Sequence, residues 1–321
     1  MNEVEQLAEM EPKTHILKVL VDFKTLYLDY KKSNNLSQHT IYNINLVLDR
    51  FYDYVAGEVS EENTLTLNDL NKYFLSNYLN NLSEEGLSKT TQKLHIIIIK
   101  NFFTFIADYD IKNFGFLHDK FNGIKIKTIQ KEKAGLSQIE QQRLKAYLVI
   151  LDSQNSFLAQ RNSLLIKMLL FTGLRISELI NIKWTDFTKV EDTKHGHIYS
   201  FLVRGKGNKE RFVYILSSEI ENNLNYLHKN KANNGYLFVT THGNTCNRTR
   251  LYLGIKKIMG DAGVMKAGLH IFRHTFARNM VDKDINLATI KDLLGHSNIT
   301  VTAQFYAKSN ENAKRKALFD K

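Results

Sequence analysis

The chain has 321 residues, of which 43% are hydrophobic and 24% are charged, a composition typical of a soluble globular protein with two domains. No apolar run approaches the roughly 18 residues that a membrane-spanning helix needs, and the glutamate-rich N-terminus does not resemble a signal peptide. A single cysteine, Cys246, excludes an internal disulfide and a multi-cysteine metal site. We therefore expect a cytoplasmic protein.

The net charge of +11 is distributed unevenly. Residues 1–133 hold 16 Lys and Arg against 18 Asp and Glu, whereas residues 134–321 hold 28 against 15. A basic second half indicates a polyanionic partner, and nucleic acid is the commonest one. A solvated lysine-rich surface explains the charge about equally well at this point.

The first part of the chain has the pattern of a helical bundle. Residues 14–32 place apolar side chains at three- and four-residue spacing, which predicts an amphipathic helix. Further helices are expected from Ser37 or Thr40, from Thr66 or Asn68, and from Thr90 to Tyr109. Four helices with short connections predict a compact domain over residues 1–117, and nothing in it indicates catalysis.

Residues 118–135 lack a clear hydrophobic period and are rich in lysine. This composition predicts an exposed linker, and a basic linker can lie along a phosphate backbone. The lysines in question are Lys120, Lys125, Lys127, Lys131 and Lys133.

The second domain, residues 136–321, is expected to open with a capping box at Ser137–Glu140. Its apolar spacing predicts helices over residues 137–150, 160–171, 217–229, 247–261, 271–281 and 286–294. Between them, residues 197–216 alternate as strands do, around a glycine-flanked hairpin at 204–209. The expected fold class is therefore mainly α with a small β-sheet or hairpin in the second domain.

Two segments of this domain carry candidate phosphate-binding groups. Arg175 is predicted just inside a helix with Glu178 one turn on, so that the carboxylate holds a guanidinium suited to phosphate oxygens. A purely structural Arg–Glu pair is about as frequent. Lys206, at the hairpin tip, suits a phosphate contact or a proton donor, although an ordinary solvated turn is the more common explanation.

The last fifty residues hold two histidines, an arginine and a tyrosine in order: His270, Arg273, His296 and Tyr306. They make chemical sense together if a phosphate is bound and a phenol attacks it. The spacing of His270 and His274 also occurs at zinc sites, but the intervening residues lack the metalloprotease glutamate and include a cation, so we expect no metal.

Residues 288–303 have a different interpretation as well. With Gly295 in the turn, they fit a helix-turn-helix. A DNA-binding regulator of that kind would need neither Tyr306 nor Arg175, and it is the rival hypothesis from another class of protein.

Five segments in this order resemble the tyrosine recombinase (phage integrase) family, and the glycine-lysine hairpin is most similar to its Xer branch. The segments are Leu174–Glu178, Gly205–Arg211, His270–Ala277, Leu293–His296 and Tyr306. The resemblance implies a C-shaped clamp of a core-binding, DNA-binding domain and a catalytic domain. It also implies a recombinase that works alone and resolves chromosome dimers at a dif-like site.

The resemblance assigns a role to each candidate. Tyr306 is the nucleophile that forms a 3′-phosphotyrosine, and His270 is the base that assists it. Arg175 and Arg273 clamp the phosphate, His296 donates a hydrogen bond to it, and Glu178 supports the site. Lys206 protonates the departing 5′ oxygen. No metal or other cofactor is implied, because the phosphotyrosine bond retains the energy of the phosphodiester.

The implied partners are double-stranded DNA, three further copies of the chain in a homotetramer on two DNA sites, and an FtsK-type DNA translocase. The tail Ser309–Lys321 is expected to dock on a neighbouring copy, with folding onto its own domain as the alternative. An integrase or excisionase of a mobile element is the alternative role. The sequence departs from the family in two places: Phe272 replaces the usual leucine, and Tyr306 lies ten residues after His296, one more than usual.

Overall fold

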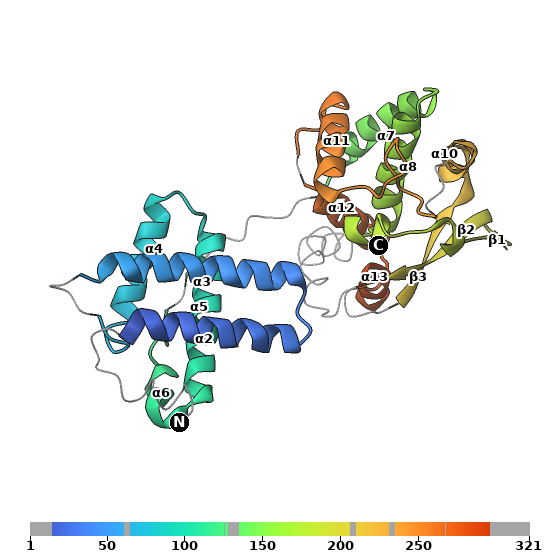
Figure 1. The fold of residues 1–321 in the computed structure, drawn as a ribbon. Helices are drawn as coiled ribbons and strands as arrows, with labels where there is room; N and C mark the ends of the chain where they lie inside the picture. The colour runs from blue at the N-terminus through green and yellow to red at the C-terminus, as the bar shows by residue number, and fades with distance from the viewer. Residues whose placement is uncertain are drawn as a thin grey trace, which may run out of the picture. The chain divides into compact units, whose positions relative to one another are not determined.

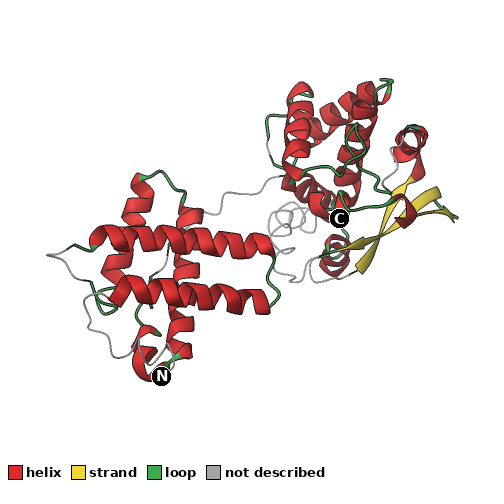
Figure 2. Cartoon of the chain, in the orientation of Figure 1, coloured by secondary structure: helices red, strands yellow, loops and turns green. Residues whose placement is uncertain are grey.

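The structure is a computed structural model that describes residues 15–60, 65–124, 126–127, 135–205, 210–230, 235–266 and 268–295. Over these ranges the chain is mainly helical with one small sheet, which confirms the predicted fold class (Figure 2). It forms two compact units, Met1–Lys131 and Glu132–Lys321, each with its own hydrophobic core. None of the helices in the described ranges has the length and apolar character to cross a bilayer.

The described part of the first unit holds four long helices followed by two short turns of helix (Figure 1). They are α2 (His15–Ser33), α3 (Gln38–Glu58), α4 (Lys72–Glu84), α5 (Lys89–Tyr109), α6 (Ile111–Phe114) and the 3-10 turn η1 (Gly115–Leu117). Ser37 and Ser88 begin α3 and α5 by accepting hydrogen bonds from backbone N–H groups three residues on. The predicted starts of both helices lie within two residues of the observed ones.

The start of α4 was predicted wrongly. Thr66 and Asn68 do not open this helix, because Asp69 folds back and accepts hydrogen bonds from the N–H and hydroxyl of Thr66 at 2.8 and 2.6 Å. Asn71 is the cap instead, and its side chain accepts from the N–H groups of Tyr73 and Phe74. A side chain that can cap a helix also stabilises a turn, so the two were not distinguishable locally.

Aromatic side chains fill the first core. Phe51 packs edge-on against Tyr78 and Phe103, and all three are almost completely buried. Tyr78 also shares a 2.7 Å hydrogen bond with Nδ1 of His95, which satisfies two buried polar groups at once. Phe121, inside the segment expected as a linker, is 3% exposed and belongs to the same core. The packed part of the first unit therefore continues past residue 117.

The second unit begins with α7 (Gln138–Asp152), opened by the predicted Ser137–Glu140 capping box. Its other described helical elements are α8 (Phe157–Thr172), α9 (Ile176–Leu179), η2 (Trp184–Asp186), α10 (Ser217–Lys229), α11 (Arg248–Asp261), α12 (His270–Val281) and α13 (Leu287–Leu294). α8 is buried on almost every face and packs against both α10 and α12 (Figure 1).

The sheet of this unit is antiparallel, in the order β1 (Phe187–Asp192), β2 (Gly196–Arg204) and β3 (Glu210–Leu216). The alternation of residues 197–216 predicted β2 and β3 correctly. β1 was not predicted. It is an edge strand whose side chains are mostly exposed, so its sequence lacks the alternation that marks a half-buried strand.

Two glycines let α12 lie close to its neighbours. Gly173 ends α8 with a left-handed φ of 65°, and a Cβ there would lie 2.6 Å from the Phe276 ring. Gly135 passes the backbone of Thr275 so closely that a Cβ would lie 2.8 Å from its nitrogen. Beside it, the Leu136 N–H donates to the Thr275 hydroxyl at 2.8 Å. The C-terminal end of α8 is thereby fixed against α12, where two of the candidate residues lie.

Candidate active site

Arg175 lies immediately before α9, not inside a helix as predicted. Its backbone is extended, with φ −74° and ψ 145°, because the chain must turn after Gly173 before the four-residue α9 begins. Glu178 holds it in two ways: one carboxylate oxygen accepts from the Arg175 N–H at 2.9 Å, and the other accepts from Nη1 at 2.8 Å. The predicted Arg–Glu pair is present, and the carboxylate fixes both the backbone and the guanidinium.

A second arginine, which the sequence did not single out, meets the same carboxylate. Arg211 of β3 donates from Nη2 to Oε2 of Glu178 at 3.0 Å and from Nη1 to Oε1 at 3.3 Å. Its Nε donates to the carbonyl oxygen of Leu293 at 3.0 Å. The sequence did offer one signal for this contact. In the alternating strand, Arg211 falls on the same face as Val213, two residues on, where an apolar side chain is expected.

The carboxylate of Glu178 is buried, with 4% of its side chain exposed. Burial alone would raise its pKa, but hydrogen bonds and charge from Arg211 and Arg175 outweigh this and leave the pKa below its ordinary value. Glu178 is therefore ionised at neutral pH. One negative charge is shared between two guanidinium groups, which leaves a net positive charge at this place.

Arg273 is the third guanidinium of the site and is 4% exposed. It donates from Nη1 to the carbonyl oxygen of Gly173 at 3.0 Å and from Nη2 to that of Leu294 at 2.6 Å. Burial lowers its pKa to about 9, and repulsion from Arg175 and Arg211 adds to this effect while Glu178 opposes it. The side chain is still protonated at pH 7.

We call Arg175, Arg211 and Arg273 the arginine cluster. The three surround Glu178 from three elements: the turn before α9, strand β3 and helix α12. His270 is the first residue of α12, is exposed, and lies one helical turn before Arg273. Such a concentration of guanidinium groups is suited to bind a phosphate and to stabilise charge that develops on it.

The remaining candidates of the site fall outside the described residues. They are Lys206, His296 and Tyr306. Lys206 lies in the connection between β2 and β3, and His296 directly follows Gly295, the left-handed residue that ends α13. In the sequence, Lys206 is therefore close to β3, which holds Arg211, and His296 is close to the end of α13, to which Arg211 and Arg273 donate. The roles of Lys206, His296 and Tyr306 stay predictions.

Of the linker lysines, Lys125, Lys131 and Lys133 also lie outside the described residues. Lys127 is exposed. Lys120 is engaged within the first unit: its Nζ donates to the carbonyl oxygen of Leu67 at 2.8 Å and to Oδ1 of Asn68 at 3.1 Å. Burial lowers the pKa of this ammonium, while the charge of Asp69 opposes that shift. Its bonds tie the end of the first unit to the turn before α4.

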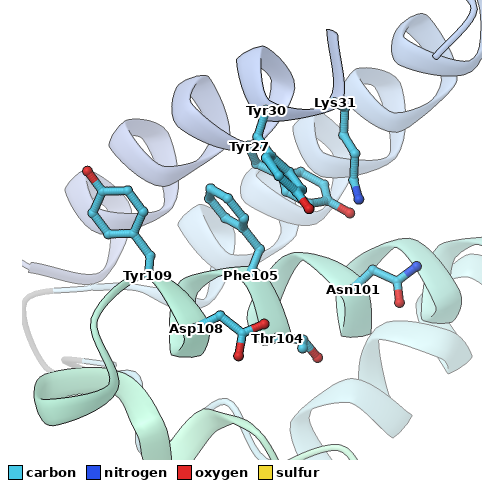
Figure 3. A pocket seen from close by; sticks show the side chains of 8 residues that line it. All are labelled: Tyr27, Tyr30, Lys31, Asn101, Thr104, Phe105, Asp108 and Tyr109. Atoms are coloured by element: carbon cyan, nitrogen blue, oxygen red, sulfur yellow. The ribbon is translucent and has the colours of Figure 1, made fainter. Parts of the chain in front are cut away.

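A cavity of about 490 Å³ lies in the first unit between α2 and α5 (Figure 3). Its lining residues are Tyr27, Tyr30, Lys31, Asn101, Thr104, Phe105, Asp108 and Tyr109. The Lys31 ammonium lies 4.7 and 5.1 Å from the ring centres of Tyr27 and Tyr30. This aromatic cavity lacks a cluster of cations like that around Glu178. The clustered guanidinium groups around Glu178 all belong to the second unit. Across the described ranges, no three metal-ligating side chains gather in one place.

Comparison with known proteins identifies the family to which the chain belongs. The phage integrase family matches residues 138–313, more than half of the chain, and the N-terminal SAM-like domain of phage integrases matches residues 24–108. The chain belongs to the phage integrase family, and it is a site-specific tyrosine recombinase similar to the Xer branch.

Curated relatives match along most of their length. A tyrosine recombinase of Pseudothermotoga lettingae is 29% identical over 252 residues, which cover 76% of this chain and 80% of the relative. Tyrosine recombinase XerC of Staphylococcus epidermidis is 27% identical over 294 residues, covering 89% of this chain and 92% of the relative. The similarity therefore extends over both units.

Solved structures of XerH share the fold. The pre-cleavage complex of XerH with its difH substrate is 25% identical, with a TM-score of 0.66 over 89% of this chain and 81% of that one. The post-cleavage complex with a palindromic difH substrate has a TM-score of 0.70 over 90% of this chain and 82% of that one, at 24% identity.

Proposed function

We propose that this recombinase binds double-stranded DNA and cleaves it through a 3′-phosphotyrosine. The phenolic oxygen of Tyr306 attacks the phosphorus, and the bond from phosphorus to the 5′ oxygen breaks. The phenolic proton passes to His270, and the departing 5′ oxygen takes a proton from Lys206. Rejoining is the reverse reaction with the 5′ hydroxyl of another strand. No cofactor is needed, because the phosphotyrosine ester keeps the bond energy.

The arginine cluster is the observation that carries this proposal. A guanidinium has five N–H donors, and the carbonyl oxygens of Gly173 and Leu294 engage two of those of Arg273. Arg175 is held by Glu178 through both its backbone and its side chain. We assign these two fixed cations to the non-bridging oxygens of the phosphate, with His296 as a further donor. Arg273 is buried and Arg175 is partly exposed, and the protein holds both in place. A site that only bound DNA would not need cations fixed in this way.

Trapping the covalent intermediate tests the chemistry. A DNA duplex selected from a random-sequence library for tight binding is nicked near the cleavage point, so that the short leaving strand diffuses away. The wild-type chain should form a covalent protein–DNA adduct on this duplex, and Tyr306→Phe should bind it equally well without forming one. Lys206→Ala should slow adduct formation and spare binding. Binding without any adduct in the wild type would favour the rival, a helix-turn-helix regulator.

We further propose that the target is a dif-like site and that the recombinase resolves chromosome dimers. The support is its similarity to Xer relatives, among them XerH, whose structures contain difH substrates. Mobile-element integration or excision is the second candidate. Mapping the selected site distinguishes them: a single site near the replication terminus supports dimer resolution, whereas sites at the ends of a mobile element support integration.

The assembly is a proposal of the same kind. We propose a homotetramer on two DNA sites, with the tail Ser309–Lys321 docked on a neighbouring copy and an FtsK-type translocase as a possible activator. The linker lysines, apart from the internally bonded Lys120, are assigned to the DNA backbone. Mass measurement of the complex with the selected duplex tests the tetramer, since deletion of residues 309–321 should leave single-site binding intact and abolish the pairing of two sites.

A further inference from the structure

The inward-facing side chains of β3 change from apolar to charged near the β2–β3 hairpin. Val213 and Ile215 point inward and are each 5% exposed, and Arg211 is the next inward position toward the hairpin. Across the sheet, Arg211 pairs with the buried Val203. An apolar side chain would continue this packing, whereas an arginine with 13% of its side chain exposed must be supplied with hydrogen-bond partners. Sheet packing alone therefore does not explain an arginine here.

The partners of Arg211 belong to two other elements. Both carboxylate oxygens of Glu178 accept from its Nη atoms, and the Leu293 carbonyl oxygen near the end of α13 accepts from Nε. Gly295 leaves the room for the guanidinium, because a Cβ at that glycine would lie 2.8 Å from Nη1. The hairpin end of β3 is thus joined to α9 and to the end of α13 through one side chain.

We propose that Arg211 is a positioning residue that fixes where the β2–β3 hairpin delivers Lys206. This inference rests on the proposed role of Lys206 as the proton donor. Lys206 lies five residues before Arg211, so the strand that Arg211 anchors leads directly into the hairpin. A proton donor must lie within hydrogen-bond reach of the departing oxygen, and misplacement by about 1 Å can slow a step about 100-fold.

Removing Arg211 should affect the hairpin more than the arginines that bind phosphate. The two hydrogen bonds from Arg175 to Glu178 do not involve Arg211. Those from Arg273 to Gly173 and Leu294 do not involve it either, so both sets should remain when Arg211 is replaced. The resulting defect should therefore fall on protonation of the leaving group, and it should disappear when the leaving group needs no proton.

A sulfur-substituted substrate isolates that step. In the selected duplex, the bridging 5′ oxygen at the cleavage point is replaced with sulfur, because a thiol with a pKa of about 8.5 leaves as the thiolate without a donor. Adduct formation is measured at saturating protein on both substrates for the wild type, Arg211→Gln and Arg211→Lys. The control is Arg204→Gln, on the same hairpin, whose arginine is 66% exposed and pairs at the surface with Glu210.

We expect Arg211→Gln to cleave the oxygen substrate about 10- to 100-fold more slowly than wild type, with unchanged DNA affinity. On the sulfur-substituted substrate, its rate should be close to that of the wild type. Arg211→Lys should behave in the same way, because lysine keeps the charge but cannot make the three hydrogen bonds. Arg204→Gln should match the wild type on both. A wild-type rate for Arg211→Gln or Arg211→Lys on oxygen, or equal slowing on both substrates, would overturn the inference.

Lys206→Ala, measured in parallel, separates this inference from the function it rests on. If sulfur does not restore cleavage by Lys206→Ala, the proposed role of Lys206 is wrong and the role of Arg211 fails with it. If sulfur restores Lys206→Ala but not Arg211→Gln, only the positioning role of Arg211 is wrong. Fluorescence of Trp184, the single tryptophan, checks that the second unit of each variant is folded at the assay temperature.

Discussion

Arg273 donates a 2.6 Å hydrogen bond from Nη2 to the carbonyl oxygen of Leu294, the last residue of α13. Its Nη1 donates to the carbonyl oxygen of Gly173, the residue that ends α8. Carbonyl groups at helix C-termini lack partners within their own helix, so one guanidinium completes the ends of two helices. The same side chain is thereby held from two sides before any phosphate arrives.

Replacing Arg273 should lower the rate of cleavage by a larger factor than it lowers the affinity for DNA. Arg273→Ala removes a fixed cation, and loss of one such donor typically costs about 100- to 1000-fold in rate. Adduct formation on the nicked duplex at saturating protein measures this effect. The matched control is Arg278→Ala in the same helix, whose arginine is 56% exposed and 3.9 Å from Asp282. Rates for the two variants within about threefold of each other would contradict a role in phosphate activation.

Gly173→Ala should destabilise the second unit through both backbone and packing. The left-handed φ costs about 1–2 kcal/mol for a residue with a Cβ, and crowding against Phe276 and Leu294 should add about 1–3 kcal/mol. Urea unfolding followed by Trp184 fluorescence gives the free energy of unfolding. Gly196→Ala is the control, because Gly196 has a φ of 74° in the same unit but open space around its Cβ position. Equal losses in the two variants would show that the contact with Phe276 and Leu294 relaxes freely.

Glu178→Gln should lower the stability of the second unit at neutral pH, because two guanidinium groups lose their buried counter-charge at a cost of about 3–5 kcal/mol. Arg211 and Arg175 hold the pKa of Glu178 below its ordinary value of 4.5 against the opposing effect of burial. The stabilisation is therefore complete above pH 4.5 and is lost as the pH falls through the lowered pKa.

The measurement is urea unfolding by Trp184 fluorescence for both proteins over this pH range. The free-energy difference between wild type and Glu178→Gln should shrink as the pH falls below 4.5. A difference that stays constant down to the lowest pH at which both proteins fold would mean that the carboxylate is not titrating there. Glu210→Gln is the control, since Glu210 is 46% exposed and its pair with Arg204 lies at the surface.

Apart from the start of α4, features decided by neighbouring residues were readable from the sequence, and those that depend on distant contacts were not. Ser137 and Glu140 form the predicted capping box, since a cap is decided within four residues. Arg175 and Glu178 pair as predicted for the same reason. Arg211 was given no role of its own: it ended a segment resembling the family and belonged to an alternating strand. Its partner Glu178 lies 33 residues away, and spacing cannot bring the two together.

The first unit offers a last prediction, on pH. Burial, with a smaller contribution from the charge of Arg50, lowers the pKa of His95 to about 4, below the ordinary value of 6.5. Between these values an unfolded chain binds a proton that the folded chain does not. Stability is therefore complete above pH 6.5 and falls by up to about 3 kcal/mol as the pH approaches 4. The 2.7 Å bond between His95 and Tyr78 is then made by a neutral imidazole at physiological pH.

His95→Gln should remove most of that dependence, because an amide can still bond to the Tyr78 hydroxyl but does not titrate. Far-UV circular dichroism follows urea unfolding of the whole chain between pH 7 and pH 4, and Trp184 fluorescence identifies the transition of the second unit. His39→Gln is the control, since His39 is exposed on α3. A wild-type pH dependence in His95→Gln, or an NMR titration of His95 near pH 6.5, would place the imidazole in contact with water. Since Tyr78 packs against Phe51 in the centre of the first core, that outcome would require this core to open in solution.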